Sequence, residues 1–137
     1  RVWQSAWINV GRFVAPYMDA DKAVPFWNKL LPPRCRERMT PEAQRWYRLL
    51  VAIGARDAQA MIDHGGEMLR KSTPESPARD TFYAAGAAIL GHLARLETDR
   101  ARDIWPELRE RLPNGSNEPS IEMRWLEAIT IARLQKQ

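Results

Sequence analysis

Cysteine is nearly absent from this chain of 137 residues, and Cys35 is its single representative. One cysteine cannot form an internal disulfide, and it cannot supply a cluster of thiolate metal ligands. Such a chain suits the cytoplasm, or a periplasmic protein that needs no disulfide bridges, so the compartment stays open. Cys35 lies between Arg34 and Arg36. A lone cysteine in a connector is usually inert.

Long apolar runs are also missing from the sequence. No stretch approaches the roughly 18 apolar residues of a membrane-spanning helix, and no signal peptide is recognisable. We therefore expect no membrane span in this segment. Because the sequence begins at Arg1 rather than at methionine, we expect a segment of a longer protein rather than a processed chain.

Signatures of enzyme chemistry are sparse. His64 and His92 are the only histidines, they lie far apart in the sequence, and no partner ligand stands at metal-binding spacing from His64. The sequence contains no glycine-rich phosphate loop and no nucleophile elbow. These absences favour a protein that is not an enzyme and has no cofactor.

The residues that are present give the composition of a globular domain. Hydrophobic residues make up 45% of the chain, charged residues make up 28%, and there are six tryptophans. A chain of this length buries a real core, and each buried aromatic side chain removes about 150–250 Å² from water. The formal net charge is +4. We interpret it as a solvated, mildly basic surface, with a specific anionic partner as the alternative.

Apolar residues recur at three- and four-residue spacing along most of the chain, which predicts α-helices. The expected helices cover residues of about 3–16, 20–31, 41–55, 58–71, 78–96, 99–112 and 119–134. The run Thr40-Pro41-Glu42 is a strong start signal, and residues 34–39 are predicted to be a polar connector. The Gly65-Gly66 pair indicates either a helix packed very close, which we prefer, or a broken helix.

Each predicted helix has an apolar stripe that we expect to face the core. The stripe of the first helix consists of Trp3, Trp7, Val10, Phe13 and Val14, and that of the second consists of Ala23, Trp27, Leu30 and Leu31. The fifth helix has small residues in its middle, which predicts two neighbouring helices, and its stripe extends to Leu96.

The stretch from Trp7 to Cys35 has the most specific spacing in the chain. It reads Trp7-x2-Val10-Gly11-x2-Val14, followed after eight residues by Ala23-x3-Trp27-x2-Leu30-x4-Cys35. This pattern resembles the tetratricopeptide repeat, W-x2-L-G-x2-Y, then A-x3-F, then P. Val14 and Cys35 depart from the usual Tyr and Pro. The later run Ala101-x3-Trp105-x2-Leu108-x4-Pro113 matches the second half of the same repeat.

The resemblance implies an all-α fold, a right-handed α-α superhelix of about three antiparallel helix pairs plus a C-terminal closing helix. The pairs would be hairpins at about 3–33, 40–72 and 77–113, and the closing helix would be at about 119–134, all in one domain spanning 1–137. The second hairpin matches the pattern least well, so its status as a true repeat is open. A two-helix solenoid of another kind is the alternative.

Proteins of this family usually bind ligands in a concave groove lined by the first helix of each repeat. Carried over through the matched positions, the predicted partner-binding groove consists of Asn9, Arg12, Gln44, Tyr47, Arg48 and Tyr83. Arginine and asparagine donate hydrogen bonds to carboxylates or peptide backbone, and tyrosine is enriched at interfaces. The alternative interpretation is that Arg12 and Arg48 pair with nearby acids and that Tyr47 is half core.

We therefore predict a noncatalytic protein–protein interaction scaffold that binds a peptide or partner protein, with an anionic ligand as one option. The alternative is an accessory or regulatory domain of a larger enzyme, or of an envelope or polysaccharide-export machine. Nucleic-acid binding is disfavoured, because acids interrupt the arginines of the sixth helix at helical-neighbour spacing, which predicts a salt-bridged solvent face. The sequence leaves partner identity and oligomeric state open.

Overall fold

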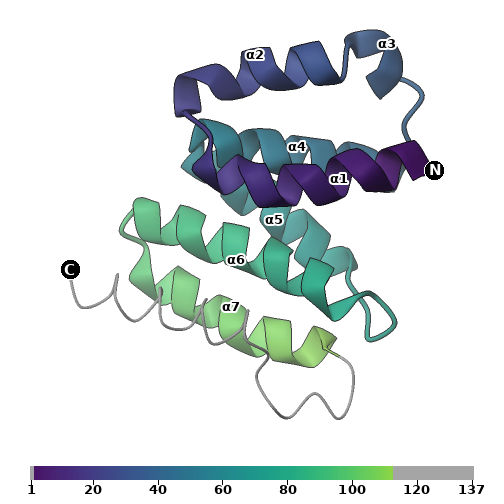
Figure 1. Ribbon diagram of the computed structural model, residues 1–137. Coiled ribbons are helices and arrows are strands. Elements are labelled where there is room, and N and C mark those ends of the chain that lie inside the picture. Colours follow the sequence, from purple (N-terminus) through teal and green to yellow (C-terminus); the bar gives the residue numbers. More distant parts are fainter. Residues whose placement is uncertain (1, 113–137) are drawn as a thin grey trace. The chain divides into compact units, whose positions relative to one another are not determined.

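The computed structural model describes residues 2–112, and the regular structure in this range is entirely helical (Figure 1). This agrees with the all-α fold class that the sequence predicts. The chain divides into two compact units, unit 1 at Arg1–Asp57 and unit 2 at Ala58–Gln137. The boundary falls inside the predicted hairpin at 40–72, whose pairing remains a prediction. The predicted closing helix at 119–134 lies outside the described residues.

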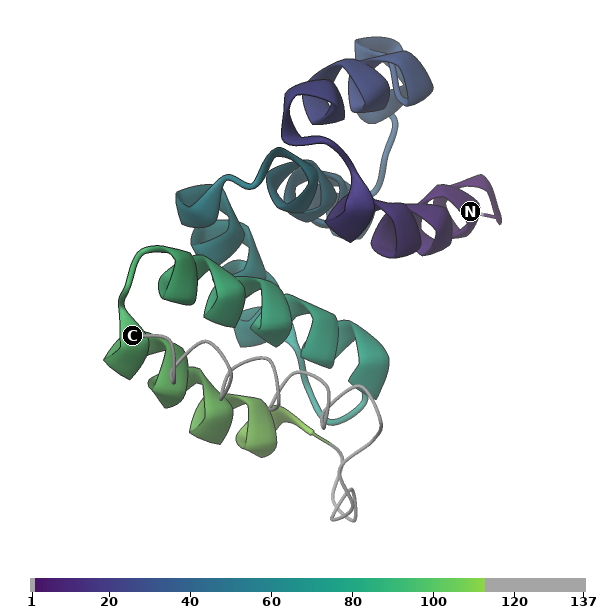
Figure 2. The ribbon, with the colours of Figure 1, turned by 60° about the vertical axis from the view of Figure 1, so that its left-hand side comes forward.

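Unit 1 is built on one helix that contacts two others. It contains α1 (Val2–Val14), the 3-10 helix η1 (Ala15–Tyr17), α2 (Ala20–Leu30), α3 (Pro33–Arg36) and α4 (Pro41–Ala55). Both α1 and α2 pack against α4 (Figure 2). The first predicted helix changes to 3-10 geometry at its end, because the ring of Pro16 disfavours α-helical geometry at Ala15.

The connector before α4 differs from the prediction. The sequence indicates a polar connector at 34–39, whereas the chain forms the short helix α3 at its beginning. Pro33 starts this helix, since its fixed φ suits the first helical position and its missing N–H is not needed there. The start of α4 is as predicted. The Thr40 hydroxyl accepts a hydrogen bond from the backbone N–H of Ala43 at 3.2 Å.

Close packing in unit 1 depends on two glycines. A Cβ atom on Gly11 would lie 2.6 Å from Cδ1 of Leu50 and 2.7 Å from Cη2 of Trp27, so the missing side chain of α1 provides the space that Trp27 fills. A Cβ atom on Gly54 would lie 3.1 Å from Cβ of Ala23, which marks the close approach of α2 and α4. Gly11 and Ala23 are the small positions of the repeat pattern.

The predicted apolar stripes of α1 and α2 are only partly correct. Trp3, Val10 and Phe13 are 47%, 56% and 76% exposed, and Leu30 is 46% exposed. The buried residues of α1 and η1 lie four apart, at Trp7, Gly11 and Ala15. This narrower stripe packs against α4 and Trp27, so the wider stripe that the sequence predicts is only partly buried.

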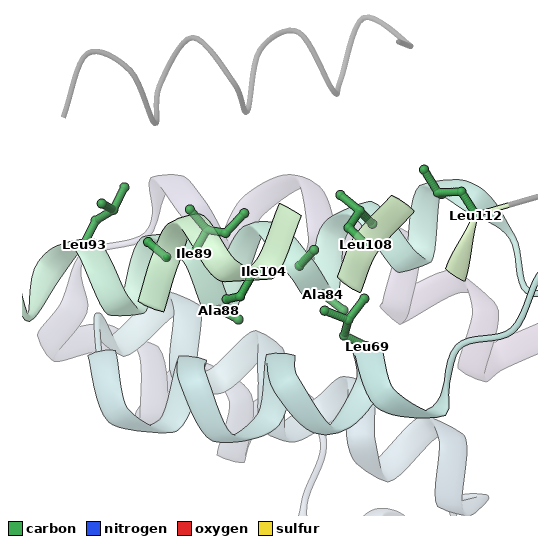
Figure 3. Packing of buried hydrophobic residues seen from close by; sticks show 10 residues of the cluster. Leu69, Ala84, Ala88, Ile89, Leu93, Ile104, Leu108 and Leu112 are labelled. Carbon is green, nitrogen blue, oxygen red and sulfur yellow. The ribbon is translucent and has the colours of Figure 1, made fainter. Parts of the chain in front are cut away.

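Unit 2 is a three-helix stack with its middle helix contacted on two sides. It contains α5 (Ala58–Lys71), α6 (Ala78–Ala94) and α7 (Thr98–Arg111), and α6 packs against both other helices (Figure 1). The small residues of α6 therefore have the two neighbours that the sequence predicts. The apolar cluster of this unit comes from all three helices, and Figure 3 labels Leu69, Ala84, Ala88, Ile89, Leu93, Ile104, Leu108 and Leu112.

The Gly65-Gly66 pair lies inside an unbroken helix, as preferred above. A Cβ atom on Gly65 would lie 2.7 Å from the carbonyl oxygen of Ala84 and 3.0 Å from the backbone nitrogen of Ala88. The backbones of α5 and α6 therefore touch at this crossing. Leu96 corrects another prediction. The helix predicted at 78–96 corresponds to α6, which ends at Ala94. Leu96 adopts a left-handed φ of 61° and is 75% exposed instead of facing the core.

Candidate functional site

The first two predicted groove residues lie together on α1. A guanidinium nitrogen of Arg12 donates a hydrogen bond to Oδ1 of Asn9, one helical turn earlier. The same guanidinium lies over the indole ring of Trp46 on α4, with its carbon 5.1 Å from the ring centroid. Asn9 and Trp46 thus hold the cation of Arg12 at the junction of α1 and α4.

The next two predicted residues lie against the α3 segment. Tyr47 accepts a hydrogen bond of 2.6 Å from Nη1 of Arg36, whose guanidinium also lies over the tyrosine ring. Nε2 of Gln44 donates to the carbonyl oxygen of Met39 at 3.2 Å. Tyr47 is half-buried and contacts the ring of Trp27 edge-on at 6.2 Å. This geometry agrees with the alternative interpretation of Tyr47 as half core.

The last two predicted residues are separated by the division of the chain. Arg48 is exposed on α4 in unit 1, whereas Tyr83 is half-buried on α6 in unit 2. The structure thus brings five of the six predicted residues into one unit. Within that unit they form two groups, Asn9 with Arg12 beside Trp46, and Gln44 with Tyr47 beside α3. A shared role in ligand binding remains a prediction.

A second surface feature was missed by the sequence reasoning. Of the eight large apolar side chains that are exposed among the described residues, seven lie within the first 30 residues. They belong to α1, η1 and α2, and they are Trp3, Val10, Phe13, Tyr17, Val24, Phe26 and Leu30. The sequence shows these residues at helical spacing, but the same spacing marks a buried face, so it carries no separate signal of exposure.

Aromatic rings connect this surface to the core of unit 1. The ring of Trp3 meets that of Trp7 edge-on at 6.5 Å between centroids, and Trp7 meets Trp27 in the same way at 6.1 Å. Phe26 contacts Trp27 at 5.3 Å. The indole N–H groups of Trp7 and Trp27 are buried with no hydrogen-bond partner among the described residues, so ring packing holds these side chains.

The net positive charge of the chain comes from unit 1. Residues 1–57 include ten basic and five acidic residues, whereas residues 58–137 include eleven basic and twelve acidic residues. The first acidic residue of the sequence is Asp19, so α1 and η1 carry no acid at all. The unit that exposes the apolar side chains of α1 therefore has a net positive charge.

The ionisable groups of unit 2 form short-range pairs. Glu97, in the turn between α6 and α7, accepts from Nδ1 of His92 at 3.1 Å and pairs with Arg95 at 3.4 Å and Arg100 at 3.7 Å. The hydrogen bond from His92 lowers the pKa of Glu97, the charges of Arg95 and Arg100 lower it further, and burial opposes them. This cluster stabilises the turn between α6 and α7, and His92 is hydrogen-bonded to Glu97 within it.

The exposed side of α7 is salt-bridged, as the sequence predicts. Arg102 pairs with Asp99 at 3.7 Å, and Arg111 pairs with Glu107 at 3.5 Å, both within one helical turn. Arg111 also donates to the carbonyl oxygens of Arg70 and Ser72, at 2.6 Å and 3.1 Å, and thereby closes the end of α5.

Residues 2–112 were also searched for two other kinds of site. No group of three or more His, Cys, Asp and Glu side chains in this range is placed to hold a metal ion. Helices of the same range all fall short of the length and apolarity that crossing a membrane requires. No protein-family model, no curated protein and no solved structure matches this chain, so its candidate site is defined by its own geometry alone.

Proposed function

We propose that this chain is a noncatalytic protein-interaction scaffold that binds a peptide or a partner protein through unit 1. The observation that carries the proposal is the set of large apolar side chains exposed on α1, η1 and α2. Tryptophan, tyrosine and phenylalanine are the residues enriched at interface cores, and exposed clusters of them mark interaction sites. The chain has four such aromatic side chains within its first 26 residues, at Trp3, Phe13, Tyr17 and Phe26.

The proposal includes a tetratricopeptide-like arrangement of helix pairs in a right-handed superhelix. Its support is that Trp7, Gly11, Ala23 and Trp27, which stand at key positions of the repeat pattern, are all buried in unit 1. Gly11 makes room for the ring of Trp27, as the small position of the pattern requires. In such an arrangement, the first helix of each pair lines the concave groove.

We expect the ligand of the predicted groove to be anionic. Arg12 is oriented by Asn9 and Trp46, and Arg48 is exposed on the neighbouring helix α4. A guanidinium group binds carboxylates through two parallel hydrogen bonds, and an orienting contact reduces the entropy lost on binding. The excess of basic residues in unit 1 would also speed the encounter with an acidic partner.

The proposal is tested by capture of partners from a lysate of the native source, followed by mass spectrometry. The wild-type chain is compared with the Arg12→Ala/Arg48→Ala variant and with an Arg102→Ala/Arg109→Ala variant, which removes the same charge from α7. We expect a specific protein partner that the first variant loses and the second retains, with unchanged helical circular dichroism. The absence of any specific partner, or equal capture by all three chains, would overturn the proposal.

A further inference from the structure

The exposed residues of α1 and η1 follow a second pattern beside the repeat. Trp3, Ala6, Val10, Phe13 and Tyr17 are separated by alternating steps of three and four residues, which is the spacing of the a and d positions of a heptad. All five residues are exposed. We name them the apolar seam. A seam of this spacing is what one helix presents to another helix packed along it.

The apolar seam is separate from the face that α1 buries. Each residue rotates the helix by about 100°, so Val10 and Phe13 lie on a different flank from the buried Trp7 and Gly11. On its other side the seam is bordered by Asn9, whose Oδ1 accepts the hydrogen bond from Arg12. Arg12 itself lies farther round the helix from the seam, with its guanidinium over the ring of the buried Trp46.

The three aromatic residues of the seam make contacts with other rings. Trp3 packs edge-on against the buried Trp7, and the rings of Phe13 and Tyr17 contact each other at 6.5 Å between centroids. Aromatic side chains that are fixed before binding lose little conformational entropy when a partner covers them. These ring contacts therefore reduce the entropy cost of binding a partner, while the seam residues stay exposed in unit 1.

We infer that the apolar seam binds an acidic amphipathic helix of another protein, an inference that rests on the proposed function and names its partner class. The heptad spacing fits a helix, whose own apolar residues would lie along Val10 and Phe13. We expect an acidic partner because unit 1 has ten basic and five acidic residues, and residues 1–18 contain no acid. The same charge opposes a second copy of this chain, because two seams would bring like charges together.

The inference is tested with two synthetic three-heptad peptides. Both have leucine at the a and d positions, and they differ only in glutamate or lysine at e and g. Each is titrated into the 137-residue chain, and binding is followed by fluorescence anisotropy at low and physiological salt. We expect the acidic peptide to bind, its affinity to fall as salt rises, and the basic peptide to bind at least about tenfold more weakly.

Two variants of matched chemistry locate the binding surface. Val10→Ser/Phe13→Ser removes two seam residues, and Val24→Ser/Phe26→Ser removes the same residue types from the exposed surface of α2. None of the four side chains is buried, so both variants should keep the helical circular dichroism of the wild type. We expect the first variant to bind the acidic peptide at least about tenfold more weakly, and the second to bind within about threefold of the wild type.

The remaining outcomes distinguish a failure of the inference about the seam from a failure of the proposed function. Equal binding of both peptides, or equal losses in the two variants, would overturn the inference. A dimer in sedimentation equilibrium that Val10→Ser/Phe13→Ser dissociates would make a second copy the occupant, and tight binding of a peptide of residues 119–134 would make it a segment of this chain. If the seam variant retains the partner captured above, the proposed function stands without the seam. If the wild-type chain captures no partner, the proposed function itself fails.

Discussion

Nη2 of Arg56 donates a hydrogen bond of 2.6 Å to the carbonyl oxygen of Pro16, which lies 40 residues earlier in the chain. The other terminal nitrogen donates to Ile53 at 2.6 Å and to Ala15 at 3.2 Å. Arg56 follows the end of α4 and has a left-handed φ of 58°. One side chain therefore closes the carbonyl end of α4 and fixes η1 beside it.

We expect Arg56→Ala to destabilise the protein by about 2–3 kcal/mol, because hydrogen bonds from a charged donor to these carbonyl groups are lost. Arg56→Lys should lie between the alanine variant and the wild type, since one ammonium group cannot reach all of the carbonyl oxygens that the planar guanidinium reaches. Urea unfolding gives the free energies. Arg34→Ala, an exposed change in α3, is the control and should stay within about 0.5 kcal/mol of the wild type. An Arg56→Ala variant as stable as this control would contradict the prediction.

The two adjacent glycines of α5 should respond in opposite directions to alanine. Gly65→Ala places a methyl group against the backbone of α6, which cannot move aside, and we expect a loss of about 1–3 kcal/mol. Gly66→Ala meets only the flexible end of Arg70, at 3.1 Å, and should gain up to about 1 kcal/mol from helix propensity. Thermal unfolding of the two variants compares them directly. Similar melting temperatures would mean that α5 and α6 do not approach closely at Gly65.

The cluster around Glu97 predicts a pH dependence of stability. The pKa of Glu97 is lowered below its ordinary value of 4.5 in the folded state, so the carboxylate stabilises the fold above that value and loses its effect as the pH falls through the lowered pKa. Glu97→Gln should therefore be less stable than the wild type at pH 7, and the difference should shrink in acid. Urea midpoints between pH 3 and pH 7 measure it. Glu110→Gln, on the exposed side of α7, is the control, and a difference for Glu97→Gln that persists at pH 3 would refute the assignment.

The start of α4 offers a smaller and more local test. Thr40→Ala removes the hydroxyl that accepts from Ala43 and also donates to Oε1 of Gln4 at 3.1 Å, and we expect a loss of about 1 kcal/mol. Thr40→Ser keeps the hydroxyl and should recover most of that loss. Equal stability of the two variants in urea would show that the cap contributes nothing.

The parts of the fold that the sequence predicts are those with local causes. The start of α4 follows from Thr40 and Pro41, and the bounds of α5 at 58–71 agree with its apolar spacing. The Gly65 crossing was also predicted, because two adjacent glycines inside a helical pattern need a compensating contact. Each of these signals lies within a few residues of the structure that it specifies.

The parts that the sequence does not predict depend on distant partners. Arg56 gives no local sign that it reaches back to Pro16, and Phe13 has the spacing of a core residue although it is 76% exposed. The contacts of the predicted groove residues also depend on structure that the sequence does not predict. Gln44 and Tyr47 face the short helix α3, which the sequence analysis did not expect, so their hydrogen bonds to Met39 and Arg36 were not foreseen.

Because Trp3 is exposed and its neighbour Trp7 is buried, the intrinsic fluorescence of Trp3 can report on the apolar seam. Trp3 is 47% exposed at the seam, while Trp7 beneath it is 6% exposed. A helix that covers the seam would remove water from the Trp3 indole and shift its emission to shorter wavelength, and the shielded Trp7 would change far less. Occupancy of this surface could therefore be followed in the unmodified chain, with Trp3→Phe as the variant in which the signal disappears.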